Sequence, residues 1–278
     1  LFYTRLGNAL LFGSELKSLL AHPAVQPAVD AEGLAEVLIM GPGRTPGQGV
    51  FRNIAELKPG CCLSYDRSGL RIQRYWQLES RPHEDDLETT TAKVRQLVCD
   101  AVIRQLISDV PVCTLLSGGL DSSAITALAA GACAGQLQTW SVDFTDNERY
   151  FVPDLFQPNT DAYWVQRVSE YLGTEHHTIT IEIPELVDAL TTAMEARDLP
   201  GMADIDASLY LFSKEIKHSA TVALSGECAD EIFGGYPWFH NSQAAAKGTF
   251  PWLRGLQERV QMLDPEIIDM IKPEEYVN

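Results

Sequence analysis

A glycine-rich loop between a predicted strand and a predicted helix constrains the fold of this sequence more than any other feature. The apolar run of residues 110–116 predicts a buried strand, and residues 124–130 have high helix propensity. Between them lies the heptad SGGLDSS, Ser117–Ser123. Glycines permit positive φ and close backbone approach, and the N–H groups at a helix start attract anions. The segment therefore predicts a phosphate-binding turn at the carboxyl end of a strand.

The side chains of this heptad support the same interpretation. Ser117, Ser122 and Ser123 would add hydroxyl donors for phosphate oxygens. Asp121 would repel a phosphate unless a cation lay between them, so we interpret it as a Mg²⁺ ligand. The alternative is a glycine turn with Asp121 or Ser122 as an ordinary helix cap. That alternative is favoured for a generic Ser-Gly-Gly sequence, but the full heptad is more specific.

A second polar loop follows another predicted strand. Residues 221–224 read TVAL and predict a mainly apolar strand, and Ser225–Tyr236 then reads SGECADEIFGGY. Both loops would lie at the carboxyl ends of parallel strands, where open α/β sheets bind ligands. Glu227 and Asp230 are three residues apart and would face one cleft if a helix begins here. The alternative is an acidic first turn that only complements the helix dipole.

The order of predicted elements indicates two domains. Residues 1–78 contain mostly short strands and turns, and the polar, acidic stretch of residues 79–88 is typical of a linker. Beyond it, strands alternate with helices, which predicts a parallel sheet with right-handed crossovers. The predicted strands are 9–13, 60–65, 70–75, 110–116, 137–143, 177–183 and 221–224, and the predicted helices are 15–20, 31–40, 87–108, 161–171, 184–195 and 208–218.

Charge and cysteine content argue against several classes of protein. The 278-residue chain carries 38 Asp and Glu against 21 Lys and Arg, a net charge of −17, which would repel nucleic acid or an anionic membrane. Six cysteines without C-x-x-C pairs favour a reduced, cytoplasmic protein. No apolar stretch approaches the roughly 20 residues that span a bilayer. We therefore expect no nucleic-acid or membrane partner.

The two loops together resemble a known enzyme family. The heptad lacks the Gly-Lys-Ser/Thr ending of a Walker loop and is similar to the pyrophosphate loop of ATP pyrophosphatases. The second loop resembles the S-G-E-x-x-D-E-x-F-G-G-Y signature of the asparagine synthetases, although Cys228-Ala229 replaces the Gly-Ser or Gly-Ala of many relatives. Three further segments also resemble that family, namely Phe12–Leu19, Glu56–Gly60 and Leu172–His177.

The resemblance implies a fold and a reaction. Residues 1–84 would be the last part of an amino-terminal nucleophile glutaminase domain, α+β and mostly strands, and residues 85–278 an incomplete ATP-pyrophosphatase domain, α/β with a parallel sheet between helices. The β-carboxylate of L-aspartate would attack the α-phosphate of ATP, giving β-aspartyl-AMP and pyrophosphate. Ammonia from glutamine would then displace AMP and yield L-asparagine.

The resemblance also implies which residues bind the nucleotide. Leu115, Val142, Ser225 and Gly226 would hold the adenosine part of ATP. The heptad, with the backbone of Gly118 and Gly119 and the hydroxyls of its serines, would hold pyrophosphate.

Three carboxylates are implied in the chemistry. Asp121 and Asp230 would share Mg²⁺, and Glu227 would support formation of the acyl-adenylate and accept a proton from ammonia. The family's glutaminase nucleophile is an amino-terminal cysteine, and no residue here can replace it. The chain begins LFYTR, without Met or a signal pattern, so we expect it to be cut at its start, and also before a pyrophosphate-binding lysine of the family. A homodimer is left open.

Several alternatives stay open at this stage. The chain could be a relative that adenylates a carboxylate and cyclises it into a β-lactam or peptide, or a non-catalytic protein that only binds nucleotide. His176 and His177 could bind a metal, but consecutive strand residues point to opposite faces. Arg197, Asp198, Asp204 and Asp206 could contact aspartate, although solvated loop charges are the favoured interpretation.

Overall fold

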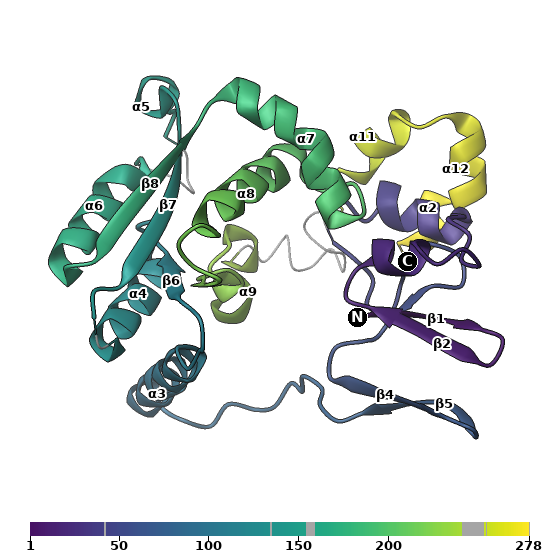
Figure 1. The fold of residues 1–278 in the computed structure, drawn as a ribbon, viewed down its shortest axis with the longest axis horizontal. Helices are drawn as coiled ribbons and strands as arrows, with labels where there is room; N and C mark the ends of the chain where they lie inside the picture. The colour runs from purple at the N-terminus through teal and green to yellow at the C-terminus, as the bar shows by residue number, and fades with distance from the viewer. Residues whose placement is uncertain (42, 134, 154–158, 241–252, 254, 278) are drawn as a thin grey trace. The chain divides into compact units, whose positions relative to one another are not determined.

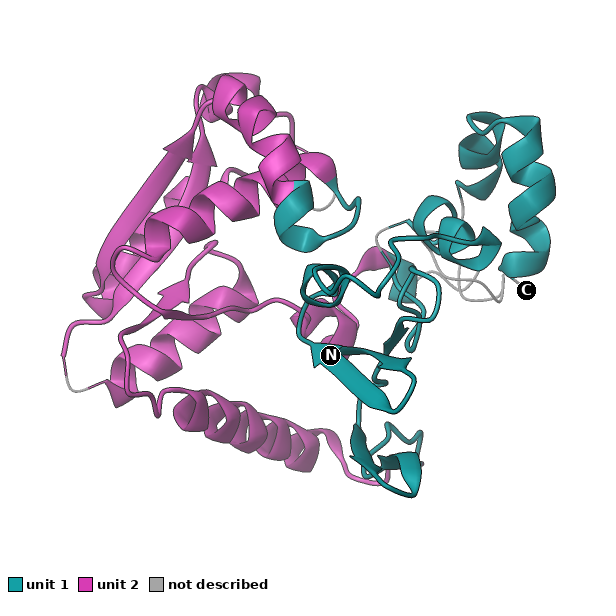
Figure 2. Cartoon of the chain, turned by 45° about the vertical axis from the view of Figure 1, so that its right-hand side comes forward, with its two compact units in different colours: residues 1–81, 194–202, 238–278 teal, residues 82–193, 203–237 magenta. Residues whose placement is uncertain are grey.

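The computed structural model describes residues 1–41, 43–133, 135–153, 159–240, 253 and 255–277. The chain divides into two compact units, coloured separately in Figure 2. The first unit contains Leu1–Arg81, Met194–Met202 and Trp238–Asn278, and the second contains Pro82–Ala193 and Ala203–Pro237. Within the described ranges, we find no helix that combines the length and the apolar character needed to cross a membrane.

The first unit combines two small antiparallel sheets with short helices (Figure 1). One sheet has the order β2-β1-β3, and the other is the β4-β5 hairpin, which turns at Asp66–Gly69. Its core gathers around Leu16, Leu19, Val25 and Ile54. The elements are β1 (Phe2–Leu6), β2 (Ala9–Gly13), α1 (Leu16–Leu20), α2 (Ala31–Leu38), β3 (Ala55–Glu56), β4 (Cys61–Asp66), β5 (Gly69–Arg74), η1 (Pro237–His240), α11 (Leu256–Gln261), α12 (Pro265–Ile271) and α13 (Pro273–Tyr276).

Within the first unit, a buried carboxylate joins α2 to the last helix, α13. Glu36 in α2 is fully buried, and its side chain accepts hydrogen bonds from the Thr45 hydroxyl at 2.8 Å and the Tyr276 hydroxyl at 2.6 Å, as well as from the Thr45 amide. A buried carboxylate is stable only when its oxygens have such donors. Burial, together with Glu36, raises the pKa of Tyr276, so this hydroxyl remains a donor at neutral pH.

The second unit is built on a four-stranded parallel sheet, as predicted. Its strand order is β8-β7-β6-β9, and every pairing is parallel. Figure 1 shows helices on both faces of this sheet. The elements are α3 (Leu87–Gln105), β6 (Val112–Leu115), α4 (Leu120–Ala132), β7 (Gln138–Phe144), α5 (Asn147–Tyr150), α6 (Asp161–Leu172), β8 (Glu175–Ile181), α7 (Ile183–Arg197), α8 (Ala203–Ile216), β9 (Val222–Leu224) and α9 (Ala229–Phe233), with the end of α7 in the first unit.

The two faces of the parallel sheet differ in chemistry. Toward α8, Cys113 and Trp140 pack on Phe212 and Ile216 in an apolar cluster. Toward α4 and α6 the sheet carries a row of polar residues in register across three strands. This row consists of Thr114 in β6, Thr139 in β7 and His176 in β8.

Hydrogen bonds satisfy this polar row. The Thr114 hydroxyl lies 3.0 Å from that of Thr126 in α4, and both residues are fully buried. The His176 ring contacts Thr139 at 2.9 Å through Nδ1 and Ser141 at 3.1 Å through Nε2. Burial lowers the pKa of His176, with a smaller contribution from His177, so the ring is held neutral.

Two predicted elements are displaced, and two strands, β1 and β3, were not anticipated. The strand predicted over residues 177–183 is β8, at Glu175–Ile181, because Gly173 ends α6 in a left-handed conformation at φ 67° and the strand follows directly. The helix predicted over residues 208–218 is α8 and begins at Ala203, with Asp204 and Asp206 in its first turn. Strand β1 has too little alternation to predict from sequence and is placed by pairing with both β2 and β3.

Candidate active site

The first loop joins β6 to α4 and is folded by its own serines and glycines. The Ser117 amide donates to the Ser122 hydroxyl at 3.2 Å, and the two serine hydroxyls lie 3.0 Å apart. Gly118 has φ 78°, and a Cβ there would lie 2.7 Å from the Trp164 Cβ and 2.9 Å from the Val165 amide nitrogen. Position 118 therefore requires glycine both for its backbone conformation and for the close approach of α6.

The start of α4 is suited to an anion. Its N-cap residue is Gly119, which provides no side-chain acceptor for the first-turn N–H groups. The Ser123 hydroxyl oxygen is buried and has no hydrogen-bond partner among the residues that the structure describes. Donors left without a partner at a helix start suit phosphate oxygens.

The second loop contacts the first. Strand β9 pairs in parallel with β6, with Leu224 opposite Thr114, so both loops leave the same edge of the sheet. A Cβ on Gly226 would lie 3.1 Å from the Asp121 Cβ and 3.1 Å from the Ser122 amide nitrogen. The structure thus brings together two motifs that lie more than 100 residues apart in the printed sequence.

The turn before α9 is shaped by local hydrogen bonds. The Glu227 amide donates to the Ser225 hydroxyl at 3.1 Å, and the Ala229 amide donates to the Gly226 carbonyl at 3.2 Å. Cys228 has φ 70°, a conformation that costs a non-glycine residue about 1–2 kcal/mol. The cysteine that replaces the usual glycine of the resembling family is thus accommodated in a strained but hydrogen-bonded turn.

Asp230 is held at the beginning of α9. A Cβ on Gly235 would overlap the Asp230 carboxylate, and the Gly235 amide donates to the Asp230 carbonyl at 3.0 Å. Burial raises the pKa of Tyr236, and the negative charges of Glu231, Asp230 and Glu227 raise it further. This end of the sheet therefore carries a negative field that favours a cation.

The donor set fits Mg²⁺ only if the nucleotide shares the ion. Among the described residues, no three His, Cys, Asp or Glu side chains form a group able to hold a metal. Asp121 and Asp230 would then provide two carboxylates, with phosphate oxygens and water completing the shell. Mg²⁺ is commonly bound by one or two carboxylates and substrate phosphates in this way.

The remaining nucleotide candidates lie at the ends of the central strands. Leu115 is the last residue of β6 and is partly buried against the apolar cluster of α8, and Val142 lies near the end of β7 and is 36% exposed. Both residues are on neighbouring parallel strands that end at the edge where the two loops lie.

Sequence analysis missed an acidic pair beside the first loop. Burial raises the pKa of Asp161, and the charge of Asp143 raises it further. The Asp161 carbonyl lies 3.1 Å from the position of a Gly118 Cβ. Asp143 lies near the end of β7, so its position at a strand end was the available signal. Residues 143–149, apart from Thr145, line a surface hollow of about 520 Å³.

The paired histidines contact different parts of the sheet. As predicted, they lie on opposite faces of β8: His176 contacts Thr139 and Ser141, while His177 stacks on Trp140 with ring centroids 4.4 Å apart. The His176 ring is held by hydrogen bonds, whereas the His177 ring is held by stacking and its Nε2 has no hydrogen-bond partner among the described residues.

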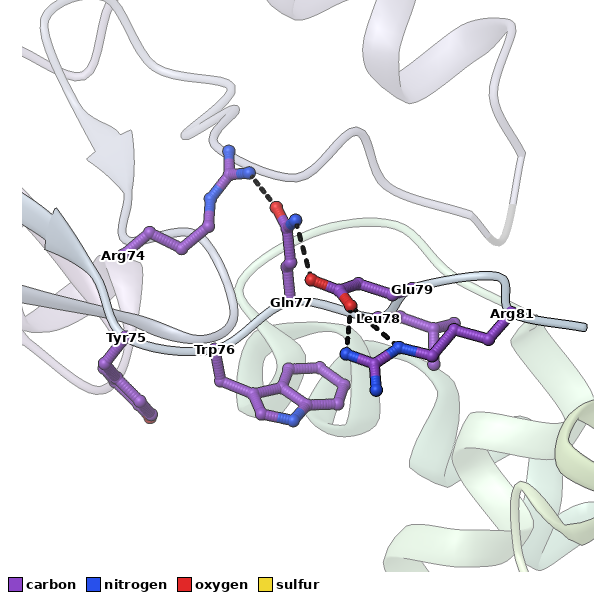
Figure 3. A pocket seen from close by; sticks show the side chains of 7 residues that line it. All are labelled: Arg74, Tyr75, Trp76, Gln77, Leu78, Glu79 and Arg81. Carbon is purple, nitrogen blue, oxygen red and sulfur yellow. Dashed lines mark hydrogen bonds and ion pairs between the residues drawn. The ribbon is translucent and has the colours of Figure 1, made fainter.

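A hollow in the first unit is occupied by its own side chains. It measures about 500 Å³ and is lined by residues 74–79 and Arg81 (Figure 3). Arg74 Nη1 donates to Gln77 Oε1 at 2.6 Å, and Arg81 Nε donates to Glu79 Oε2 at 3.0 Å. Because these polar and charged side chains form hydrogen bonds with one another, we assign the hollow no ligand.

Comparison with known proteins identifies the family of each part. The family model for asparagine synthase matches residues 93–277, and the model for a glutamine amidotransferase domain matches residues 1–76. Asparagine synthetase [glutamine-hydrolyzing] 3 of Bacillus subtilis is 50% identical over 281 residues, which cover 100% of this chain and 45% of that protein.

More distant relatives have the same description. The asparagine synthetase [glutamine-hydrolyzing] of Asparagus officinalis is 33% identical over 64% of this chain and 33% of its own length. Asparagine synthetase B [glutamine-hydrolyzing] of Escherichia coli is 33% identical over 70% of this chain and 36% of its own length. The chain spans less than half the length of each of these three relatives. With a family model that matches most of its length and with its two loops in contact at one edge of a parallel sheet, this chain belongs to the asparagine synthase family.

Proposed function

We propose that the protein containing this chain converts L-aspartate to L-asparagine at the expense of ATP, with glutamine as the source of ammonia. The observation that carries this proposal is the contact of Gly226 with the Asp121–Ser122 backbone, which makes one site of the two loops. ATP would be split to AMP and pyrophosphate, and aspartate would be activated as β-aspartyl-AMP. We further propose residues 1–84 as the glutaminase part and residues 85–278 as part of the synthetase domain.

The nucleotide would lie across the ends of β6, β7 and β9. Leu115, Val142, Ser225 and Gly226 would contact adenosine. The heptad Ser117–Ser123 would bind pyrophosphate through the N–H groups of the α4 start and through serine hydroxyls, including the unpartnered one of Ser123.

The carboxylates would divide the remaining roles. Asp121 and Asp230 would hold Mg²⁺ together with phosphate oxygens, and the ion would supply Lewis acidity at the α-phosphate. Glu227 lies in the second loop and is exposed. It would accept a proton from ammonia as the nitrogen attacks the acyl carbon.

The alternatives are not retained. The relatives above are all named as glutamine-hydrolysing asparagine synthetases, which supports amidation rather than internal cyclisation. Asp121, Glu227 and Asp230 are all present, which argues against a protein that only binds nucleotide. All six cysteines are free, which supports a reducing, cytoplasmic location. We propose a homodimer without nucleic-acid or membrane partners.

The test is a product analysis on the full-length protein. With ATP, Mg²⁺, aspartate and either glutamine or ammonia, AMP and asparagine should form in equal amounts. Formation of ADP, or AMP formation that does not depend on aspartate, would refute the proposal. Asp121→Asn and Asp230→Asn should each reduce pyrophosphate release by roughly a hundred-fold or more while glutamine hydrolysis continues, because charge stabilisation at the phosphates is lost.

A further inference from the structure

Asp198 is a buried anchor and not a solvated loop charge. It follows α7 directly, has φ 73°, and only 7% of its side chain is exposed. Its Oδ1 accepts a hydrogen bond from Lys17 Nζ at 2.8 Å, and its Oδ2 accepts one from the Leu16 amide at 2.7 Å. Leu16 is the first residue of α1, and the preceding Glu15 does not cap the helix. Asp198 therefore acts as the missing N-terminal cap of α1.

Lys17 in turn caps the C-terminal end of α7. Its Nζ donates to the carbonyls of Ala196 at 2.9 Å and Glu195 at 3.4 Å, which belong to the last turn of α7. Carbonyls in a last turn lack helical partners, and a cation there complements the helix dipole. The hydrogen bond to Asp198 raises the pKa of Lys17, so its charge is maintained. Each helix thus caps the other.

The residues after Asp198 continue the attachment. Leu199 packs against the cluster that contains Leu16 and Leu19. Arg44 Nη2 donates to the Pro200 carbonyl at 3.0 Å. Three consecutive residues are therefore fixed in the first unit, one by charge, one by apolar burial and one by a hydrogen bond.

The contact between Lys17 and Asp198 joins segments that match two different family models. Lys17 lies in the segment that matches the glutamine amidotransferase model, and Asp198 lies in the segment that matches the asparagine synthase model. The earlier turns of α7 belong to the second unit, where Ala189 and Ala193 pack with Ala207 of α8. Helix α7 is continuous, and its earlier turns belong to the second unit while its last residues belong to the first unit.

We propose that Lys17 and Asp198 form a capping joint that couples the glutamine-hydrolysing part of the protein to its synthetase part. The proposal rests on the proposed function. The two residues are positioning residues: they touch no substrate and act by fixing the end of α7. The joint keeps the hydrolysis of glutamine coupled to the use of the ammonia in asparagine synthesis. When the joint is lost, ammonia escapes as glutamine is hydrolysed.

The test compares three changes in the full-length protein with a matched control. Lys17→Met removes the charge and the cap of α7. Asp198→Asn removes the charge but keeps a residue that tolerates the left-handed conformation. Lys17→Arg keeps the charge and should therefore keep the coupling of the wild type. Lys272→Met is the control, since Lys272 forms an exposed pair with Glu275 at 3.6 Å.

Two readouts separate coupling from general damage. In Lys17→Met and Asp198→Asn, asparagine formed per glutamate released should fall roughly three- to ten-fold, while ammonia-dependent synthesis stays near the wild-type rate. Amide hydrogen exchange of residues 14–20 and 194–202 should become faster in both variants. The arginine and control variants should behave as wild type.

Other results would overturn the inference. An unchanged asparagine-to-glutamate ratio, or a parallel loss with glutamine and ammonia, would show that the contact is merely structural. Unchanged hydrogen exchange would show that the caps do not hold these segments. Should wild-type protein make no asparagine from either nitrogen source, the proposed function fails and the coupling with it, while the exchange data still decide whether the joint exists.

Discussion

At the scale of single residues, glycine positions decide whether the nucleotide loop can form. Gly118 has φ 78° and is in tight contact with α6, whereas Gly173 has φ 67° with open space around its Cβ position. Alanine at either site would meet the backbone cost of roughly 1–2 kcal/mol, but only alanine 118 would also displace packed neighbours. Comparing the two alanine substitutions therefore distinguishes the effect of backbone strain from the effect of steric overlap.

We predict different outcomes for these two substitutions. Gly118→Ala should lower aspartate-dependent pyrophosphate release by roughly a hundred-fold, because the loop would move by about an ångström. Gly173→Ala should lower the thermal unfolding midpoint modestly and leave the rate of release near that of the wild type. Equal rates for the two variants would contradict the role given to the Gly118 contact.

Sequence reasoning identified residues whose role depends on their local context. The heptad follows a predicted strand and precedes a predicted helix, and its conformation is close to what those neighbours dictate. The pairing of Asp198 with Lys17, by contrast, links positions that are 181 residues apart, and that of Tyr276 with Glu36 links positions 240 apart. Contacts of this kind have no local signature, because they are set by tertiary packing.

At the scale of secondary structure elements, a polar row under the sheet is the least expected feature. His176 lies between hydroxyl groups of Thr139 and Ser141, and burial lowers its pKa. In the unfolded chain its pKa would be about 6.5. The unfolded state thus binds more protons as the pH falls below that value, so the stability that the neutral ring provides is lost in this range.

The lowered pKa of His176 predicts that the stability of the fold depends on pH. The urea concentration at the unfolding midpoint should be constant near neutral pH and should decrease between about pH 6.5 and the lower pKa of the folded state. His176→Gln should flatten this part of the curve because the titrating group is gone. A dependence that persists unchanged in His176→Gln would assign the proton uptake to another group.

Element boundaries followed from sequence where a cap or turn residue marks them. Asp86 caps α3, which begins at the predicted Leu87, and Gly69 turns the β4-β5 hairpin. Strand β1 has no clear alternation of apolar and polar residues, and helices α11 to α13 are short. Their positions depend on packing partners that the sequence does not reveal.

At the scale of the whole molecule, the family segments and the compact units divide the chain differently. The family models assign residues 1–76 and 93–277, while the compact units group residues 194–202 and 238–278 with the amino-terminal part. The synthetase segment therefore contributes to both units. Alternation of strands and helices predicted the parallel sheet, but it could not predict which later segments return to the first unit, because that return depends on long-range contacts.

We propose above all that the site formed by the loops after β6 and β9 activates the β-carboxylate of aspartate by joining it to AMP. The most direct test uses L-aspartate labelled with heavy oxygen in that carboxylate, given to the full-length protein with ATP, Mg²⁺ and ammonia. The carboxylate oxygen that attacks phosphorus stays with AMP when ammonia displaces it. We expect each AMP to carry one labelled oxygen and pyrophosphate to carry none. Unlabelled AMP, or label in inorganic phosphate with ADP as product, would contradict this mechanism.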